Sequence, residues 1–256
     1  MGKKINPKVF RLNTVLEHNS KWFCAKQNFP KMLEEDTRIR KYIKNKFENS
    51  GVSKIEIKRS GGNIEVILNT SKPGVIIGRG GAGVEEIKKE IKKKFFGSKK
   101  IKIIITITEI SKPDLDAELI RQNMAMQILK RMPFRRVMKR AIEQAKRAGA
   151  KGIKVIASGR LNGVEIARTE SLTDGKIPTH TLRANIDYSR GKVNTLYGTI
   201  GLKVWIYKGD VFDFAKTEDN EKENKTTGRN NRRQSKAPVA KLNNRVKKTI
   251  NQDKEK

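Results

Sequence analysis

Glycines in one short stretch, PGVIIGRGGAGVEEIKKEI, suggest two kinds of phosphate chemistry. Gly78, Gly80 and Gly83 fit the spacing G-x-G-x-x-G, which in a strand-to-helix turn holds the pyrophosphate of a dinucleotide. Gly78, Arg79, Gly80 and Gly81 also fit G-x-x-G, a loop that clamps the backbone of a nucleic acid. The same glycines therefore point to two unrelated functions.

The residues before the loop favour the nucleic-acid clamp. A dinucleotide fold needs a buried central strand here, but Pro73 and Gly74 leave only three apolar residues before Gly78. The preceding runs KIEIKR and NIEVILN alternate apolar and polar residues around the turn SGG, which predicts a hairpin. No second mononucleotide-binding half follows. In a clamp, the glycines let a sugar-phosphate backbone approach, and amides at the start of the next helix attract anions.

Basic residues accompany this loop. Arg79 lies at its tip, and the predicted helix behind it offers Lys88, Lys89 and Lys92 as a basic face. A plainer alternative stays open, in which the lysines are a solvated face and the glycines only form a tight turn. The surrounding order is helix (30–48), strand, strand, glycine loop, helix, strand (101–110), which makes the motif more specific than G-x-x-G alone.

A second α/β unit follows the first. The segments 113–132 and 134–150 are predicted helices separated by Pro133, which breaks the helical pattern. Four strand-like runs come next, at 152–158, 164–172, 180–188 and 197–209, with Asp-Gly and Arg-Gly turns between them. We predict two helices packed on a mostly antiparallel sheet, and an α+β fold for the whole chain.

The second of these helices has two chemically distinct arcs. Its apolar arc contains Phe134, Val137, Met138, Ala141, Ile142, Ala145 and Ala148, and its basic arc contains Arg135, Arg136, Lys139, Arg140, Lys146 and Arg147. Only Glu143 interrupts the basic arc, so phosphate contact is favoured over a merely solvated face. Four further arginines extend this surface or pair with strand acids such as Glu165, Glu170 and Asp187, and both readings stay open: Arg160, Arg168, Arg183 and Arg190.

Composition points to a polyanionic partner. The 256 residues include 58 Lys and Arg against 27 Asp and Glu, a net charge of +31, which repels itself in a compact state. From Ala215 onward the chain has no aromatic residue and no apolar period, so we expect disorder there. With one cysteine and two histidines, no structural zinc site is expected. No Walker A lysine motif or carboxylate cluster suggests a catalytic site, a metal or a cofactor.

Seven stretches resemble, in order, the family of ribosomal protein S-three of the small subunit, in its bacterial or organellar form. They are MGKKINPKVFRL, KPGVIIGRGGAGVEEI, DLDAELI, FRRVMKRAI, GAKGIKVIASGRLNGVEIARTES, HTLRANIDY and YGTIGLKVWIYKG. The resemblance covers about residues 1–212, and the later stretches are more specific than the glycine loop. It implies an N-terminal arm (1–29), a type II KH domain (30–112) and a C-terminal α/β domain (113–212), before a disordered basic tail (213–256).

The resemblance also implies partners and sites. The family binds rRNA in the head of the small subunit, near proteins S-ten, S-fourteen and S-two. With S-four and S-five it lines the mRNA entrance channel, where two arginines and a lysine matching Arg135, Arg136 and Lys139 help structured mRNA to pass and unwind. We expect further rRNA contacts from the arm and the second domain, at Lys3, Lys4, Arg11, Arg140, Lys146, Arg147, Arg160, Arg168 and Arg183.

Some residues depart from the family pattern. Val9 and Phe10 replace a glycine-led pair, Asn13 stands where a glycine is common, and Ser171 and Leu172 replace an aromatic pair. The implied location is the small ribosomal subunit in the cytoplasm, or in the matrix if the chain is organelle-encoded. Two other functions are kept as alternatives: a free KH-type regulator that prefers certain single strands, and a nucleic-acid or dinucleotide enzyme, for which no site is visible.

Overall fold

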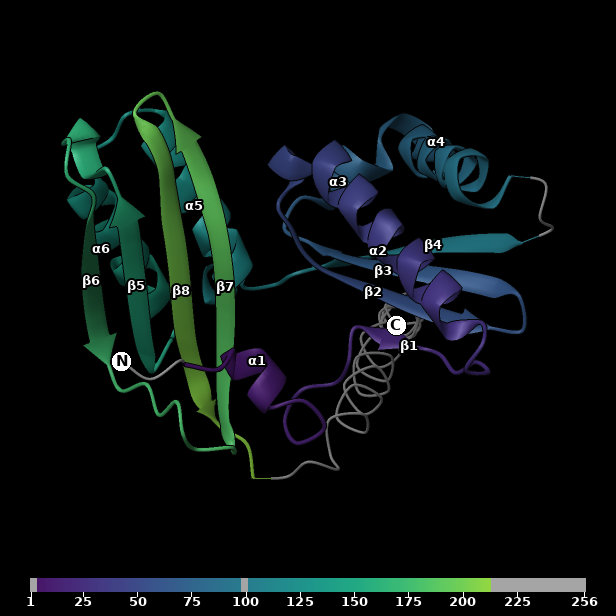
Figure 1. The fold of residues 1–256 in the computed structure, drawn as a ribbon, viewed down its shortest axis with the longest axis horizontal. Coiled ribbons are helices and arrows are strands. Elements are labelled where there is room, and N and C mark those ends of the chain that lie inside the picture. The colour runs from purple at the N-terminus through teal and green to yellow at the C-terminus, as the bar shows by residue number, and fades with distance from the viewer. Residues whose placement is uncertain (1–3, 98–100, 213–256) are drawn as a thin grey trace, which may run out of the picture. The chain divides into compact units, whose positions relative to one another are not determined.

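Two four-stranded sheets, each accompanied by helices, account for most of the residues that the computed structural model describes, which are 4–97 and 101–212 (Figure 1). The predicted tail at 213–256 and the predicted RNA contact Lys3 lie outside these ranges. Within them, no helix combines the length and the apolar character needed to cross a membrane.

The first sheet follows the predicted order of elements. Helix α2 (Phe29–Lys46) precedes the hairpin of β2 (Val52–Ser60) and β3 (Asn63–Thr70). Helices α3 (Pro73–Ile77) and α4 (Ala82–Ile91) then lead to β4 (Lys102–Glu109), and a π-helical turn (Lys92–Phe96) extends α4. Strand β3 pairs antiparallel with β2 and parallel with β4. The residues Val75–Ile77 are helical, which agrees with the rejection of a central strand before the loop.

One face of the first sheet is covered by α2 and α4. Ile39 and Ile43 of α2 are fully buried with Ile57 of β2 and Ile91 of α4. In β4 the alternation predicted from the sequence is present. Ile103, Ile105 and Ile107 of the strand pack against this core, as does Ile101 just before it. Period-two alternation therefore places one face of the strand inside.

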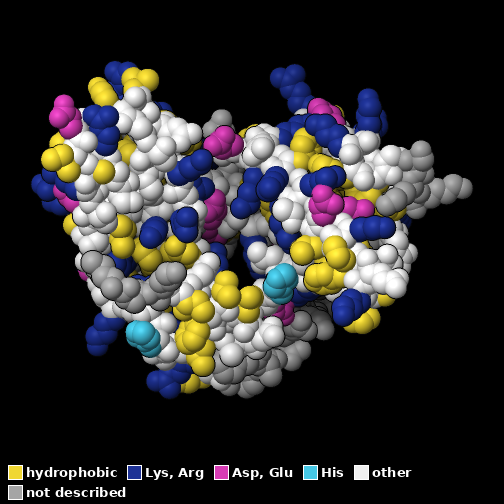
Figure 2. Space-filling view, viewed as in Figure 1, with side chains coloured by type: hydrophobic (Ala, Val, Ile, Leu, Met, Phe, Trp, Pro, Cys, Tyr) yellow, Lys and Arg dark blue, Asp and Glu magenta, His cyan; other side chains and the backbone are white. Residues whose placement is uncertain are grey.

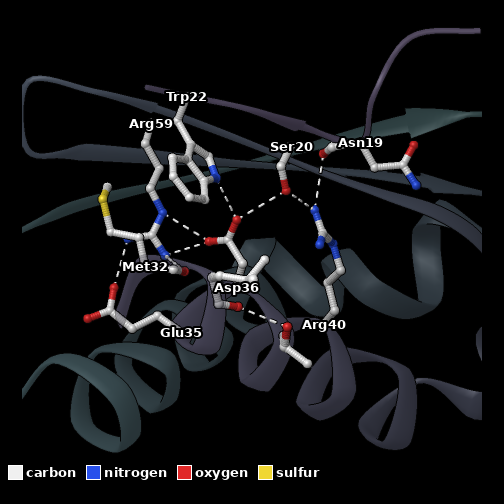
Figure 3. A network of polar contacts seen from close by, with 10 residues as sticks. Asn19, Ser20, Trp22, Met32, Glu35, Asp36, Arg40 and Arg59 are labelled. Carbon is white, nitrogen blue, oxygen red and sulfur yellow. Dashed lines mark hydrogen bonds and ion pairs between the residues drawn. The ribbon is translucent and has the colours of Figure 1, made fainter. Parts of the chain in front are cut away.

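A buried ionic network ties the N-terminal arm to this core (Figure 3). Asp36 of α2 is fully buried and accepts hydrogen bonds from Arg59 Nε at 2.9 Å, Trp22 Nε1 at 2.8 Å and Ser20 Oγ at 3.1 Å. Arg59 also donates to Glu35 at 2.7 Å. The short strand β1 (Ser20–Lys21) pairs parallel with β2, so the arm joins the sheet through backbone and side chains.

The second sheet is antiparallel throughout. Its strands are β5 (Gly152–Gly159), β6 (Arg168–Gly175), β7 (Ala184–Thr195) and β8 (Gly198–Asp210), in the spatial order β6-β5-β8-β7. Helices α5 (Ala117–Leu129) and α6 (Phe134–Arg147) pack on one face through a core that includes Met124, Val137 and Val204. Pro133 directly precedes α6, as predicted. The predicted α+β fold is confirmed.

The predicted boundaries of two strands were wrong. The run 164–172 becomes strand only at Arg168 and continues to Gly175. Strand β7 begins at Ala184 and passes through Arg190 and Gly191, where the sequence suggested a turn. A Cβ at Gly191 would lie 2.3 Å from Nη1 of Arg121, so this glycine admits a close side chain from α5 instead of ending the strand.

The prediction that Arg11 contacts rRNA was wrong. The side chain of Arg11 is fully buried and cannot reach an external ligand. It follows the short helix α1 (Pro7–Phe10). Its guanidinium donates to five backbone carbonyls, which belong to Pro7, Pro178, Thr179, Thr181 and Ala184. Arg11 therefore fastens the arm to the second domain. Nearby, Asn13 has φ +66°, a conformation that glycine favours and asparagine tolerates. The turn can therefore form here with asparagine in place of the glycine that is common in the family pattern.

Candidate nucleic-acid interface

The glycine loop joins α3 to α4 through three left-handed residues. Gly78, Gly80 and Gly81 have φ values of +69°, +60° and +83°, which a residue with a Cβ adopts only under strain. Arg79 is exposed among them. The loop therefore presents backbone and one cationic side chain at the start of α4, where the amides of the first turn attract anions.

Two glycines of the motif have different roles. A Cβ at Gly83 would lie 2.6 Å from the carbonyl oxygen of Ile76, so Gly83 permits α4 to pack directly against α3. A Cβ at Gly80 would meet nothing within 4 Å. Gly83 thus serves the fold, whereas the space around Gly80 is open to an approaching ligand backbone.

Two acidic side chains of α4 have a partner within the protein, whereas its basic side chains are available to a ligand. Glu86 and Glu90 both pair with Lys46 of α2, at 3.2 and 2.7 Å. Lys89 and Lys92 are exposed, and Lys88 is partly exposed. Among the described residues, no acid forms an ion pair with these three lysines or with Arg79, so their charge is available to an external anion.

Helix α6 presents the predicted arcs, with one unexpected set of partners. Its apolar arc is buried at Phe134, Val137, Met138, Ala141 and Ala145 and partly buried at Ile142, and the six basic side chains are exposed. Arg135, however, donates two hydrogen bonds to Glu170 of β6, at 3.0 and 3.1 Å. Lys146 pairs with Asp174 of the same strand at 3.0 Å.

The basic arc of α6 is thus partly neutralised. Arg147 lies 4.0 Å from Glu143, whereas Arg136, Lys139 and Arg140 pair with no acid of the described residues. The hydrogen bonds and charge of Glu170 raise the pKa of Arg135, and Arg135 in turn lowers the pKa of Glu170. From the sequence, Glu170 was one of three possible acidic partners for the arginines of the strands. Its contact with Arg135 of α6 spans 35 residues and follows from strand placement.

The other cations predicted to contact rRNA differ in whether they already have partners within the protein. Arg168 is 3.4 Å from Glu170 and also stands over the ring of Phe134. Arg160 donates to the backbone carbonyls of Val164 and Tyr197, at 3.0 and 3.3 Å. Lys4 and Arg183 are both exposed, and Arg183 Nε lies 3.8 Å from a carboxylate oxygen of Asp210.

An α-β-β-α-α-β unit with an exposed G-x-x-G loop defines the class of KH-domain proteins. A family model described as KH domain matches residues 38–115, and one described as Ribosomal protein S3, C-terminal domain, matches residues 124–206.

Curated relatives extend the match to most of the chain. Small ribosomal subunit protein uS3 of Desulforamulus reducens is 48% identical over 84% of this chain and 96% of its own length. The uS3 protein of Caldicellulosiruptor saccharolyticus is 51% identical, over 82% and 94%. The uS3c protein of Guillardia theta is 47% identical, over 82% and 96%. The chain belongs to the uS3 family of small ribosomal subunit proteins, which are structural proteins and not enzymes.

Proposed function

We propose that this chain binds rRNA in the head of the small ribosomal subunit and contacts mRNA as it enters. The family membership supports a place in the small subunit. The exposed G-x-x-G loop and the lysines of α4 supply an rRNA clamp, with Gly80 as the point of closest approach. Proteins S-ten, S-fourteen and S-two are the proposed neighbours, in the cytoplasm or in an organelle matrix.

Helix α6 is the proposed contact with mRNA at the entrance channel, beside proteins S-four and S-five. The observation that carries this proposal is the set of exposed cations on one helix face that lack an acidic partner within the described residues: Arg136, Lys139 and Arg140. Arg135 belongs to the same site, with its guanidinium held in position by Glu170. A row of fixed cations attracts the phosphates of a passing strand without reading its sequence.

Unwinding in this proposal is passive. The basic face holds single strands as the ribosome draws the message in, so base pairs that open transiently are kept from closing. Phosphate contacts from several cations also predict a steep salt dependence, with a slope of about 0.7 logarithmic units for each contact on a single strand.

Sedimentation tests the ribosomal assignment first. Tagged chain from a lysate is run through sucrose gradients at increasing salt, and protein is compared with rRNA in each fraction. We expect about one copy per small subunit that survives high salt. Loss to the top of the gradient at modest salt contradicts the proposal and favours a free KH-type regulator.

Gly80→Asp tests the clamp, with Gly80→Asn as the matched control. Both side chains tolerate the left-handed conformation and have open space, but only the aspartate adds negative charge. We expect Gly80→Asp to weaken binding to a head-domain rRNA fragment much more than Gly80→Asn does. Equal binding of the two variants contradicts a phosphate-contacting loop.

Alanine at Arg135, Arg136 and Lys139 together tests the mRNA contact. The control is Lys146→Ala, which removes one exposed cation of the same helix that already pairs with Asp174. We expect the triple variant to assemble into subunits and to slow translation through structured messages. Equal slowing on unstructured messages, or an equal effect from the control, refutes the role in unwinding.

A further inference from the structure

The face of the second sheet opposite α5 and α6 combines aromatic and basic side chains. In β5 the core residues alternate with Lys154 and Ile156, which therefore point to this open face. The register places Trp205 of β8 directly beside Lys154, and Tyr188 of β7 beside Trp205. One row across all four strands is therefore Thr173, Lys154, Trp205 and Tyr188.

The centre of this row is an aromatic pair. The rings of Tyr188 and Trp205 have centroids 5.1 Å apart and an interplanar angle of 44°. Lys154 Nζ lies 6.0 Å from the centroid of the Trp205 ring. Both rings remain partly exposed. Aromatic planes on an open four-stranded sheet are suited to stacking unpaired bases.

The rows beside it add uncompensated positive charge. Arg190 and Lys203 are paired across β7 and β8, and Lys192 follows in the next row. Among the described residues, none of these cations has an acidic partner, and neither has Lys154. In Figure 2, dark blue Lys and Arg side chains lie beside yellow hydrophobic ones over this sheet.

The acidic residues of the edge strand point the other way. Glu170 and Asp174 of β6 face the helices, where they pair with Arg135 and Lys146. The residues of β6 on the open face are instead the hydroxyl side chains of Thr169, Ser171 and Thr173. The open face therefore carries cations, hydroxyl groups and aromatic rings, without an acidic residue in these rows.

We propose that this open face binds unpaired nucleotides of RNA, with bases stacked on Trp205 and Tyr188 and phosphates held by Lys154, Arg190 and Lys203. The inference rests on the proposed RNA-binding function and gives it a third surface, apart from the G-x-x-G loop and α6. Charge excludes two other occupants, because the segment from Ala215 onward and a second copy of this chain are both net positive. A duplex would hide the base faces that aromatic rings require.

Salt-dependent titration of the full chain with a short fluorescent single-stranded RNA tests this proposal. Trp205→Leu keeps an apolar side chain but removes the stacking plane, and we expect binding roughly 5- to 150-fold weaker. A double variant, Arg190→Gln with Lys203→Gln, is expected to reduce the salt slope by about 1.4. The control Lys130→Gln removes an exposed cation at the end of α5 and is expected to leave the slope unchanged.

The outcomes separate this inference from the proposed function. If Gly80→Asp weakens binding while the Trp205 and double variants bind like wild type, the open-face site is overturned and the clamp stands. If wild type binds no RNA, both fail. In assembled subunits, a photo-crosslinker placed at position 203 is expected to capture rRNA, and capture of protein alone overturns the proposal. The double variant leaves the sheet core intact, so it decides the matter even if Trp205→Leu unfolds.

Discussion

Replacing Asp36 with alanine is expected to destabilise the first domain strongly. The carboxylate is fully buried and neutralises Arg59, whose side chain is only 8% exposed. Removing one partner of a buried ion pair costs about 3–5 kcal/mol, because the remaining charge has lost both its partner and water. Glu35 stays 2.7 Å from Arg59 and keeps part of the compensation, so we expect about 3 kcal/mol.

The same helix supplies the matched control. Glu34 pairs with Arg38 at 2.6 Å, but these side chains are 61% and 62% exposed. Glu34→Ala therefore removes the same kind of contact from water-exposed surroundings, and we expect a loss below about 0.5 kcal/mol. Both variants remove a carboxylate of α2 that pairs with an arginine. The difference between their losses of stability therefore reports the effect of burial.

Trp22 fluorescence during urea unfolding is a suitable assay. The chain has two tryptophans, so a Trp205→Phe background leaves Trp22, which donates directly to Asp36, as the single reporter. The expected result is a large fall in the urea midpoint for Asp36→Ala and a small one for Glu34→Ala. Equal shifts would refute the reasoning that this buried network holds the arm and sheet together.

Three further predictions concern the fold. Arg11→Met should cost about 2–4 kcal/mol by leaving buried carbonyls without donors, yet leave the salt slope of RNA binding unchanged, as calorimetry and salt titration can check. Gly83→Ala should lower the melting temperature, since its Cβ would lie 2.6 Å from a backbone oxygen, whereas Gly74→Ala, with open space, should not. Burial tends to raise the pKa of Glu118, but the hydrogen bond and charge of Arg121 outweigh it and lower that pKa. Glu118 thus stabilises the fold at pH values above the ordinary pKa of glutamate, and this contribution is lost as the pH falls through the lowered pKa of Glu118. The difference in melting temperature between wild type and Glu118→Gln should therefore shrink on acidification.

Local patterns in the sequence were enough to predict the elements and their faces. The 3.6-residue period of α6 separated buried Phe134 and Val137 from exposed Arg136 and Lys139. Alternation in β4 identified its packed face, and Pro133 marked the boundary between α5 and α6. These features depend on neighbours within a few residues, where helix and strand geometry dictate which side chains share a face.

Contacts between distant segments were not predictable in this way. The sequence placed Arg11 among the RNA-contacting cations, although burial against five carbonyls gives it a structural role. It also described the basic arc of α6 as nearly free of acids, but Glu170 reaches Arg135 from β6. Neither contact has a local signature, because each depends on where a second segment is placed.

By itself, then, the sequence determined the α+β class, the G-x-x-G loop and the division of α6 into an apolar and a basic arc, since each follows from residue type and short-range spacing. The tertiary structure decided which cations are free to meet RNA. It paired Arg135 and Lys146 with the acids of β6, and strand register brought Lys154, Trp205 and Tyr188 into one row. Register is set by how whole strands align, so no single stretch of the sequence contains it.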